Sequence, residues 1–497
     1  MQAQPTRRQL LRAGLAAGAG AALTRYAPWA AVPATADAMP PAERRALGLP
    51  VGAASSHGDS SIAAAIRSGA IPRNSPLETV VRSLQSLDTT DDGHDSGGRP
   101  RNPEWRREPS SDAGRRLRSR FRDLRRHFVF EYYPWYQVQP YDHWNEGGHR
   151  PPFDIAAPLM PALGPYDSGN ANVIAQHARW IAESGVGAIA LSWWGQGSYC
   201  DRAVPLIMDV MHAHDIHVTF HLEPYRDDRV RFYADDIRYI LRQYGERRRW
   251  DAFLLLERAD GTASPIFKSF RTILSPTFVD CKGRTRRVPD FATTGEWRQQ
   301  TDAIRDAVRP SFEHLVLLAD SLNLESTTAA GFDGIAIYDS FVRPSVWESA
   351  ATASGSNHLL FSFPINCGFD RYVSVAPQHD CDLPIPFEPP VGPIDWTSLD
   401  SRGKAHAASV DRVLESTATT IDVQVGPGSF NDARGFFLTY INTFNEWHEG
   451  TAFEPARNLA DLLPEERAFN YHNPPDGGWR LRLLRSLLQP ILGGASA

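Results

Sequence analysis

Hydrophobic residues along most of this chain form short continuous runs that alternate with amphipathic stretches. The run at 187–194, GAIALSWW, is typical of a strand buried on both faces, because polar residues do not alternate along it. The stretch at 173–184 instead carries apolar residues at helical spacing. By these criteria strands are predicted at 128–133, 187–194, 217–222, 264–270, 315–319, 334–338, 359–364 and 435–441, and helices at 173–184, 203–214, 234–244, 293–307, 398–416 and 477–488.

The regular alternation of strands and helices indicates an α/β protein with a parallel sheet and helical cover. About eight strands favour a closed barrel over an open, doubly wound sheet. No Gly-rich phosphate loop follows the first strand, which argues against a dinucleotide-binding fold. We therefore predict a single (β/α)₈ barrel at residues 127–497, preceded by a long, partly disordered N-terminal extension.

The extension at 39–126 is poor in periodic apolar pattern, so little order is expected there, and its role stays open. Its last part, from Arg115 to Arg126, is dense in arginine, with a few apolar residues between. We interpret this part as a solvated helix that leads into the barrel. A patch that binds polyanions is the alternative, and little in the sequence supports it.

The first residues have the pattern of an export signal. Arg7 and Arg8 precede a weakly apolar stretch at 13–23, and A-x-A-type cleavage sequences follow within 34–38. The stretch is too short for a transmembrane helix, and no lipobox cysteine lies near it. The pattern resembles a twin-arginine signal, so we expect a signal peptide at 1–38, export to the periplasm or medium, and no membrane anchor.

Composition and charge exclude several classes of function. The net charge of −6 gives no argument for nucleic acid as a partner. The four cysteines contain no C-x-x-C pair, so a zinc or redox site built on cysteine is not expected. No cofactor is expected, and a monomer is the default expectation. The disulfide state stays open for Cys200, Cys281, Cys367 and Cys381.

The segments just past the predicted strands gather aromatic, carboxylate, amide and histidine side chains. In a β/α barrel these segments lie at one face and build the active site. Aromatic rings stack on sugar faces, and planar polar groups bind adjacent hydroxyls, so a carbohydrate cleft is predicted. Its candidate substrate-binding residues are Tyr133, Trp135, Tyr136, His143, Trp144, Trp194, His221, Glu223, Tyr225, Tyr338, Asn445 and His448.

The sequence N-E-W-H-E at 445–449 is the sharpest chemical feature. Glycoside cleavage needs two carboxyl groups, and Glu446 and Glu449 are close enough in sequence to face one substrate. Two solvated loop glutamates are the bland alternative, which the neighbouring Phe444 and Trp447 weaken. A metal site of Glu446, His448 and Glu449 ranks well below the hydrolase, because no second-shell pattern accompanies it. No metal is therefore expected.

The same motif, with others in a fixed order, resembles glycoside hydrolase family 99, which contains endo-α-mannosidases and endo-α-1,2-mannanases. The resemblance covers about residues 128–456. It is specific because many short motifs keep their order. They are YYPWY at 132–136, HW at 143–144, LGPY at 163–166, SWW at 192–194, H-x-x-P-Y at 221–225, AGFDG at 330–334, FNEWHEGT at 444–451 and FEP at 453–455.

The resemblance implies a (β/α)₈ barrel that hydrolyses internal α-mannosidic linkages with retention of configuration. It implies that Glu446 deprotonates the 2-hydroxyl of the sugar, which attacks the anomeric carbon, and that Glu449 is the general acid/base. It also implies that Tyr338 and Glu223 lie near the sugar. Trp194 matches a position that favours mannose over glucose in the next subsite, although a buried strand-end role is a serious alternative.

Some positions depart from the family pattern and leave the exact glycan and linkage open. Gln137 stands where the family has glycine, and the segments at 253–315 and after Tyr338 fit poorly. His448 favours the hydrolase proper, because a related group has alanine there. The expected substrate is α-mannan or a mannose-containing oligosaccharide, with α-1,2 linkages favoured. The alternatives are a hydrolase of another α-linked polysaccharide and a glycan-binding barrel without catalysis.

Overall fold

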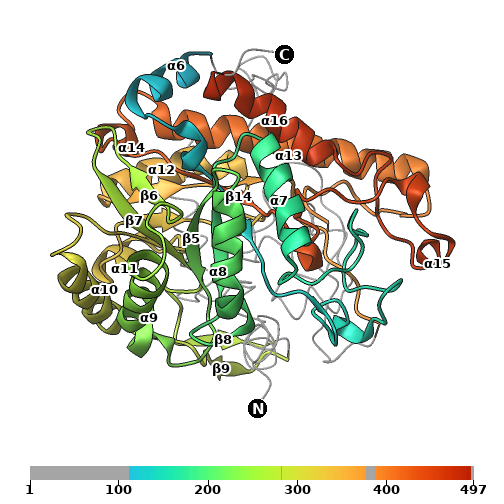
Figure 1. Cartoon of the computed structure of the whole chain (residues 1–497), viewed down its shortest axis with the longest axis horizontal. Coiled ribbons are helices and arrows are strands. Elements are labelled where there is room, and N and C mark those ends of the chain that lie inside the picture. Colours follow the sequence, from blue (N-terminus) through green and yellow to red (C-terminus); the bar gives the residue numbers. More distant parts are fainter. Residues whose placement is uncertain (1–110, 281, 376–386, 494–497) are drawn as a thin grey trace, which may run out of the picture.

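The computed structural model describes residues 111–493 except 281 and 376–386 (Figure 1). The predicted signal peptide and most of the extension lie outside these residues. The described chain builds one parallel sheet whose strands follow one another in chain order. The strands are β1 (Phe128–Tyr132), β4 (Ala188–Trp193), β5 (His217–Leu222), β7 (Ala263–Ser269), β10 (Val316–Ala319), β11 (Gly334–Ala336), β12 (Leu360–Ser362), β13 (Ile365–Asn366) and β14 (Thr439–Asn442).

The sheet closes into a barrel through one interrupted strand. β12 pairs with β11, and β13, which begins three residues after β12 ends, pairs with β14. β14 also pairs with β1, which in turn pairs with β4. The segment at 360–366 therefore fills the seventh strand position, and the predicted (β/α)₈ barrel is confirmed. Phe363 and Pro364 interrupt this strand; proline has no N–H to donate to the ladder.

A helix follows each strand position and covers the outside of the barrel (Figure 1). The sequence did not predict α11 (Leu324–Ala329) or α12 (Trp347–Ser356). Helix α11 is only six residues long, and α12, WESAATASGS, has little apolar periodicity. The helices are α7 (Ala171–Glu183), α8 (Tyr199–His212), α9 (Tyr233–Ile240), α10 (Thr294–Val308), α11 (Leu324–Ala329), α12 (Trp347–Ser356), α13 (Leu399–Val425) and α16 (Trp479–Leu492).

Several small elements are added to this barrel. Two antiparallel strand pairs lie within residues 253–315, the segment that fits the family pattern poorly. β6 pairs with β7, and β8 pairs with β9. A third pair, β2 with β3, follows β1. The bounds are β2 (Gln137–Val138), β3 (Tyr141–Asp142), β6 (Leu255–Glu257), β8 (Thr277–Val279), β9 (Thr285–Arg287), α6 (Ser111–Arg120), α14 (Phe430–Ala433) and α15 (Pro464–Arg467).

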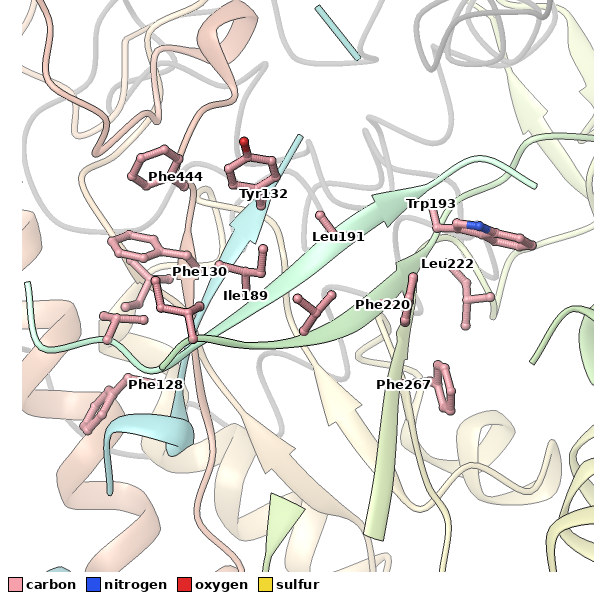
Figure 2. Packing of buried hydrophobic residues seen from close by; sticks show 14 of the residues in the cluster. Phe128, Phe130, Tyr132, Ile189, Leu191, Trp193, Phe220, Leu222, Phe267 and Phe444 are labelled. Atoms are coloured by element: carbon pink, nitrogen blue, oxygen red, sulfur yellow. The ribbon is translucent and has the colours of Figure 1, made fainter. Parts of the chain in front are cut away.

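The strands are buried on both faces, as their continuous apolar runs predict. Along β1, Phe128, Phe130 and Tyr132 belong to the large cluster between sheet and helices, and Val129 belongs to a separate cluster inside the barrel. Figure 2 shows the outer cluster from close by. The inner cluster consists mostly of aliphatic residues that fill the barrel interior. It includes Val129, Ala188, Ala190, Ile266, Val316, Leu318, Ala336, Leu360 and Tyr440.

A layer of charged side chains lies inside the barrel, at strand positions nearer the carboxyl ends than most of this apolar cluster. Lys268 of β7 donates to Glu131 of β1, and His221 Nδ1 of β5 lies 3.3 Å from Glu131 Oε2. Burial opposes ionisation of Glu131, but Lys268 and His221 outweigh it and hold the pKa of this carboxyl at about 2. Burial raises the pKa of Asp320, at the end of β10, to about 6.

The predicted solvated helix between Arg115 and Arg126 is wrong in its environment and its bounds. Helix α6 begins at Ser111, and its residues Ala113 and Leu117 are buried in the main core. Arg118 donates to the backbone oxygen of Pro490 at 2.8 Å, which ties α6 to the end of α16. The apolar residues between the arginines therefore pack, and the packed region begins before the predicted domain boundary at residue 127.

The described residues also give information on the cysteines and on possible membrane-spanning helices. Cys200 and Cys367 are buried free thiols, whereas Cys281 and Cys381 lie outside the described part of the chain. Within 111–280, 282–375 and 387–493, every helix is too short or too polar to cross a bilayer.

Asp320→Asn should change how stability depends on pH. The folded pKa of about 6 lies above the ordinary value of 3.8, so the folded state holds this proton more tightly than the unfolded state. The wild-type protein should therefore lose about 2.5 kcal/mol of stability through this group as pH rises from 4 to 7. The variant should lack this loss, so its melting temperature relative to wild type should rise over the same range.

The matched control is Asp306→Asn, because Asp306 is exposed on α10. Its melting temperature should track that of the wild-type protein across the pH series. A difference between Asp320→Asn and wild type that stays constant with pH would contradict the raised pKa.

Candidate active site

A tight turn after β14 carries both candidate catalytic glutamates. The backbone N–H of Thr443 donates to Thr451 O at 3.1 Å, which closes the turn, and Phe444 N donates to Glu131 O at 2.7 Å. The turn ends at Gly450, whose φ of +63° favours glycine. A Cβ at this position would lie 2.3 Å from the backbone oxygen of Asp370, so a side chain does not fit.

Three hydrogen bonds to the fully buried carboxylate of Glu454 hold this turn from beneath. Glu454 Oε2 accepts from Tyr166 Oη at 2.7 Å and from Trp447 Nε1 at 3.0 Å. Its other oxygen lies 3.2 Å from His177 Nε2. Because Trp447 lies between the two glutamates in the sequence, these bonds fix the backbone that carries both.

Asn445 anchors the same turn to the end of β1. Its Oδ1 accepts from the backbone N–H of Tyr133 at 2.7 Å, and its Nδ2 donates to Tyr133 O at 3.1 Å. This side chain therefore takes the place of a strand partner for Tyr133, the residue that follows β1. The structure places Asn445 as a fully buried support of the turn.

Glu446 is almost fully buried, with 1% of its surface exposed. Its Oε1 accepts from the backbone N–H of His448 at 3.1 Å and lies 3.4 Å from His448 Nδ1. The backbone N–H of Glu446 donates to Thr443 Oγ1 at 2.8 Å. The side chain is therefore held in one orientation by its own turn.

Glu449 lies in different surroundings from Glu446. Its Oε2 accepts a hydrogen bond from the hydroxyl of Tyr338, beyond the end of β11, at 2.7 Å. Its backbone oxygen accepts from the N–H of Asp370 at 2.8 Å, and the residue is partly exposed. The two carboxylates of the motif thus have separate partners, and one of them is open to solvent.

An aromatic cluster surrounds the turn and brings together most of the predicted sugar-binding rings. Trp135 stacks on His143, with ring centroids 4.6 Å apart and an interplanar angle of 11°. Tyr136 stacks on Trp144 at 4.1 Å and accepts from Trp447 N at 3.0 Å. Tyr136 and Trp144 are fully buried, so they support the other rings of this cluster. The cluster includes Tyr133, Trp135, Tyr136, Trp144, Trp194, Tyr338 and Trp447.

The ends of β4 and β5 join through Ser192. Its hydroxyl donates to Glu223 Oε1 at 2.9 Å and accepts from Trp194 Nε1 at 3.0 Å. His221 Nδ1 lies 3.9 Å from the same Glu223 oxygen. Ser192, which was not among the predicted site residues, therefore connects Glu223 and Trp194, and His221 approaches the same carboxylate.

Tyr225 points its hydroxyl away from this group. That hydroxyl donates to Asp236 of α9 at 2.5 Å, and the Tyr225 ring approaches that of Trp193 with centroids 6.0 Å apart. Tyr225 also packs closely against Gly195, where a Cβ would lie 2.7 Å from its ring. These contacts indicate that Tyr225 supports the loop that follows β4.

Four residues that shape the site were missing from the predicted set, namely Glu131, Lys268, Asp320 and Glu454. A glutamate and a lysine inside otherwise apolar barrel strands are a signal that the sequence does contain, because an unpaired buried charge is rarely tolerated. The partner of each charge, however, lies on a different strand and becomes evident only in the folded barrel.

A separate surface hollow of about 260 Å³ does not include the catalytic turn. Its lining comes from the loop after β4 and from α9 with the helical turn that follows. The lining residues are Gln196, Asp235, Arg238, Tyr239, Arg242, Gln243 and Arg247.

The closed barrel, with two carboxylates and an aromatic wall at the carboxyl ends of its strands, is the arrangement of a glycoside hydrolase. The family model of glycosyl hydrolase family 99 matches residues 123–258. This match confirms the resemblance to the family that was noted in the sequence.

Similar proteins agree with this assignment. The chain is 27% identical over 378 residues to a glycoprotein endo-alpha-1,2-mannosidase-like protein of Mus musculus, covering 67% of this chain and 72% of the relative. It is 26% identical over 362 residues to the glycoprotein endo-alpha-1,2-mannosidase of Mus musculus, covering 65% and 67%. The solved GH99 endo-alpha-mannosidase of Bacteroides thetaiotaomicron shares the fold, with a TM-score of 0.51 at 20% identity, covering 75% of this chain and 99% of that one.

Tyr166→Phe should test whether the buried bonds beneath the turn position the glutamates. The Tyr166 hydroxyl donates to Glu454 and also accepts from Asn445 Nδ2 and Trp447 Nε1, both at 3.2 Å. Its loss should destabilise the protein by about 1–3 kcal/mol. It should lower kcat about 10- to 100-fold, because the turn relaxes while the substrate-facing groups remain.

Denaturant unfolding and steady-state kinetics measure the two effects. Tyr141→Phe is the control, because Tyr141 packs against the same aromatic cluster but its hydroxyl does not contact Glu454. Equal kinetics in both variants would show that the turn does not depend on these bonds.

Proposed function

We propose that this glycoside hydrolase cleaves internal α-mannosidic linkages, with α-1,2 linkages favoured, and retains the anomeric configuration. The names of the similar curated proteins support the mannoside substrate. The observation that carries the chemistry is the pairing of Glu446 and Glu449 on one turn in unlike surroundings. One carboxylate is buried and held by its own turn, and the other is partly exposed and bound by Tyr338.

In the proposed first step, Glu446 removes the proton from the 2-hydroxyl of the reacting mannose. The freed oxygen attacks the anomeric carbon and forms a 1,2-anhydro sugar, while the bond to the leaving oxygen breaks. Glu449 gives its proton to that leaving oxygen. Both acids have thus exchanged protonation states, with no net proton lost or gained.

The second step reverses these roles. Glu449 takes a proton from water, whose oxygen attacks the anomeric carbon and opens the anhydro ring. Glu446 returns its proton to the 2-oxygen. Two inversions at the anomeric carbon give net retention, and the enzyme returns to its starting state. The partly exposed position of Glu449 supports its part in this step, because water can reach it.

The surrounding groups support sugar binding on either side of the turn. Trp135, with 4% of its surface exposed, and Trp194, with 6%, have ring centroids 6.0 Å apart. Because the Trp194 indole N–H is already bonded to Ser192, this ring can contribute only its apolar surface to a subsite. We propose that this surface favours mannose over glucose next to the cleavage point.

Export completes the proposal. The twin-arginine-type pattern at 1–38 would deliver a folded enzyme to the periplasm or medium, where polymeric α-mannan is accessible. Cellular fractionation with and without the Arg7–Arg8 pair tests this part separately from the chemistry.

A panel of defined glycans should identify the substrate class. We expect α-1,2-linked mannan to be cut internally, so that oligosaccharides appear before free mannose. Chromatography of early products measures this order. Turnover only on another α-linked polysaccharide would support the second hydrolase reading, and binding without turnover on any member would support the glycan-binding barrel.

Glu446→Gln and Glu449→Gln should respond differently to the leaving group. Each should lower turnover of α-mannan about 10²- to 10⁴-fold, the usual contribution of acid–base catalysis. An aryl leaving group that needs no proton should restore the first step in Glu449→Gln. It should not restore Glu446→Gln, because the attacking oxygen is still not formed.

Release of the aryl group under single-turnover conditions measures this step. Glu465→Gln, an exposed glutamate of α15, is the control and should behave as wild type. Rescue of Glu446→Gln but not of Glu449→Gln would show that the two roles are exchanged.

A further inference from the structure

Two histidines and one glutamate meet at the edge of the catalytic turn. His143 and Glu146 come from the loop after β3, and His448 comes from the turn after β14. One ligand atom of each lies within 4.8 Å of those of the other two. Within the described residues this is the one cluster of histidine, cysteine and acidic side chains with the spacing of a metal site.

The spacing fits a small cation after modest side-chain movement. His143 Nδ1 lies 3.1 Å from Glu146 Oε1. Ligand atoms about 2.0–2.2 Å from a tetrahedral zinc ion are about 3.4 Å from one another. This pair is therefore already close to the required separation, and His448 has to approach it. The three side chains are nearly buried, so few alternative positions are open to them.

The imidazole ring of His448 is oriented as metal ligands usually are, and that of His143 is held by stacking. His448 Nε2 lies 2.8 Å from the backbone oxygen of His143 and donates to it. That bond leaves His448 Nδ1 as the nitrogen that can offer a lone pair. The ring of His143 is held by stacking on Trp135, and its Nδ1 is buried without a hydrogen bond although it faces Glu146.

The donor set selects the class of ion. Two imidazole nitrogens and one carboxylate oxygen suit zinc and neighbouring transition metals, whereas Mg²⁺ and Ca²⁺ prefer oxygen ligands. We propose that His143, Glu146 and His448 form a binding site for Zn²⁺ or a similar transition-metal ion, and that the bound ion inhibits cleavage.

Inhibition follows from the position of Glu446, and this part rests on the proposed function. Glu446 Oε1 lies 3.4 Å from His448 Nδ1, the nitrogen that would bind the ion. A divalent ion at this nitrogen would lie beside the Glu446 carboxylate and compete with the sugar 2-hydroxyl for its oxygen. Glu446 would then remove a proton from the sugar poorly.

Titration of the intact protein with ZnCl₂ tests the site directly. Isothermal calorimetry should show one Zn²⁺ bound per chain to wild type. Glu146→Gln should weaken that binding by more than about tenfold, since loss of a ligand should exceed the loss of an outer-shell partner. The control Glu183→Gln, at the exposed end of α7, should bind as wild type. MgCl₂ should not compete.

Equal Zn²⁺ affinity in Glu146→Gln and wild type would overturn the site. Should Glu146→Gln fail to fold, Co²⁺ added to the wild-type protein gives an independent test. A four-coordinate site produces strong visible absorption, and His143→Asn should abolish it. Absence of that absorption in the wild-type protein would overturn the proposal.

Inhibition is measured by initial rates at increasing ZnCl₂, followed by chelation. Wild type should lose activity and recover it, whereas Glu146→Gln should remain active at the concentration that inhibits wild type. Binding that depends on Glu146 but leaves the rate unchanged would overturn the inhibitory role. If α-mannan is not a substrate at all, the calorimetric test still decides the site, so the two proposals fail separately.

Discussion

The buried carboxylate of Glu454 is the constraint on which the arrangement of the candidate active site depends. It accepts hydrogen bonds from Tyr166 and Trp447 and pairs with His177, all without contact with solvent. A buried carboxylate left without such partners would be strongly unfavourable, so the turn cannot shift without a large loss of stability. These bonds also hold the backbone of Glu446 and Glu449, because the two glutamates lie on either side of Trp447 in the sequence.

The charged layer inside the barrel extends the same principle to the other strands. Lys268, Glu131 and His221 come from three different strands; Lys268 pairs with Glu131 away from water, and His221 lies beside the same carboxylate. Asp320 continues this layer and accepts from the backbone N–H of Tyr338 at 3.1 Å. Tyr338 in turn binds the Glu449 carboxylate, so the layer supports this side chain, whereas Glu454 holds the backbone that carries both glutamates. Replacement of Lys268 by an apolar residue would leave a buried carboxylate uncompensated.

Much of the barrel could be predicted from the sequence, because its strands are continuous apolar runs separated by amphipathic helices. The prediction was incomplete where local pattern is weak. The predicted strand at 359–364 did not include its continuation past Pro364 into β13, and α12 is rich in small residues, so it has no clear helical period. Helix α6 was expected to be solvated because its arginines dominate the composition, although Ala113 and Leu117 face the core.

The candidate site was predicted for a different reason. Residues beyond parallel strands must meet at one end of a barrel, so Trp194, Tyr338 and Glu446 could be grouped without knowing the structure. The sequence does not show which buried side chain supports which residue of the site. Glu454 and His177 are distant in the chain, and only the folded barrel brings them together.

The most direct test of the account is the anomeric form of the product before mutarotation. Proton NMR during the first minutes of α-mannan hydrolysis measures which anomer of the new reducing end appears first. The arrangement of Glu446 and Glu449 as partners in a two-step displacement predicts the α-anomer. Initial formation of the β-anomer would mean a single displacement by water and would contradict the assigned roles of both glutamates.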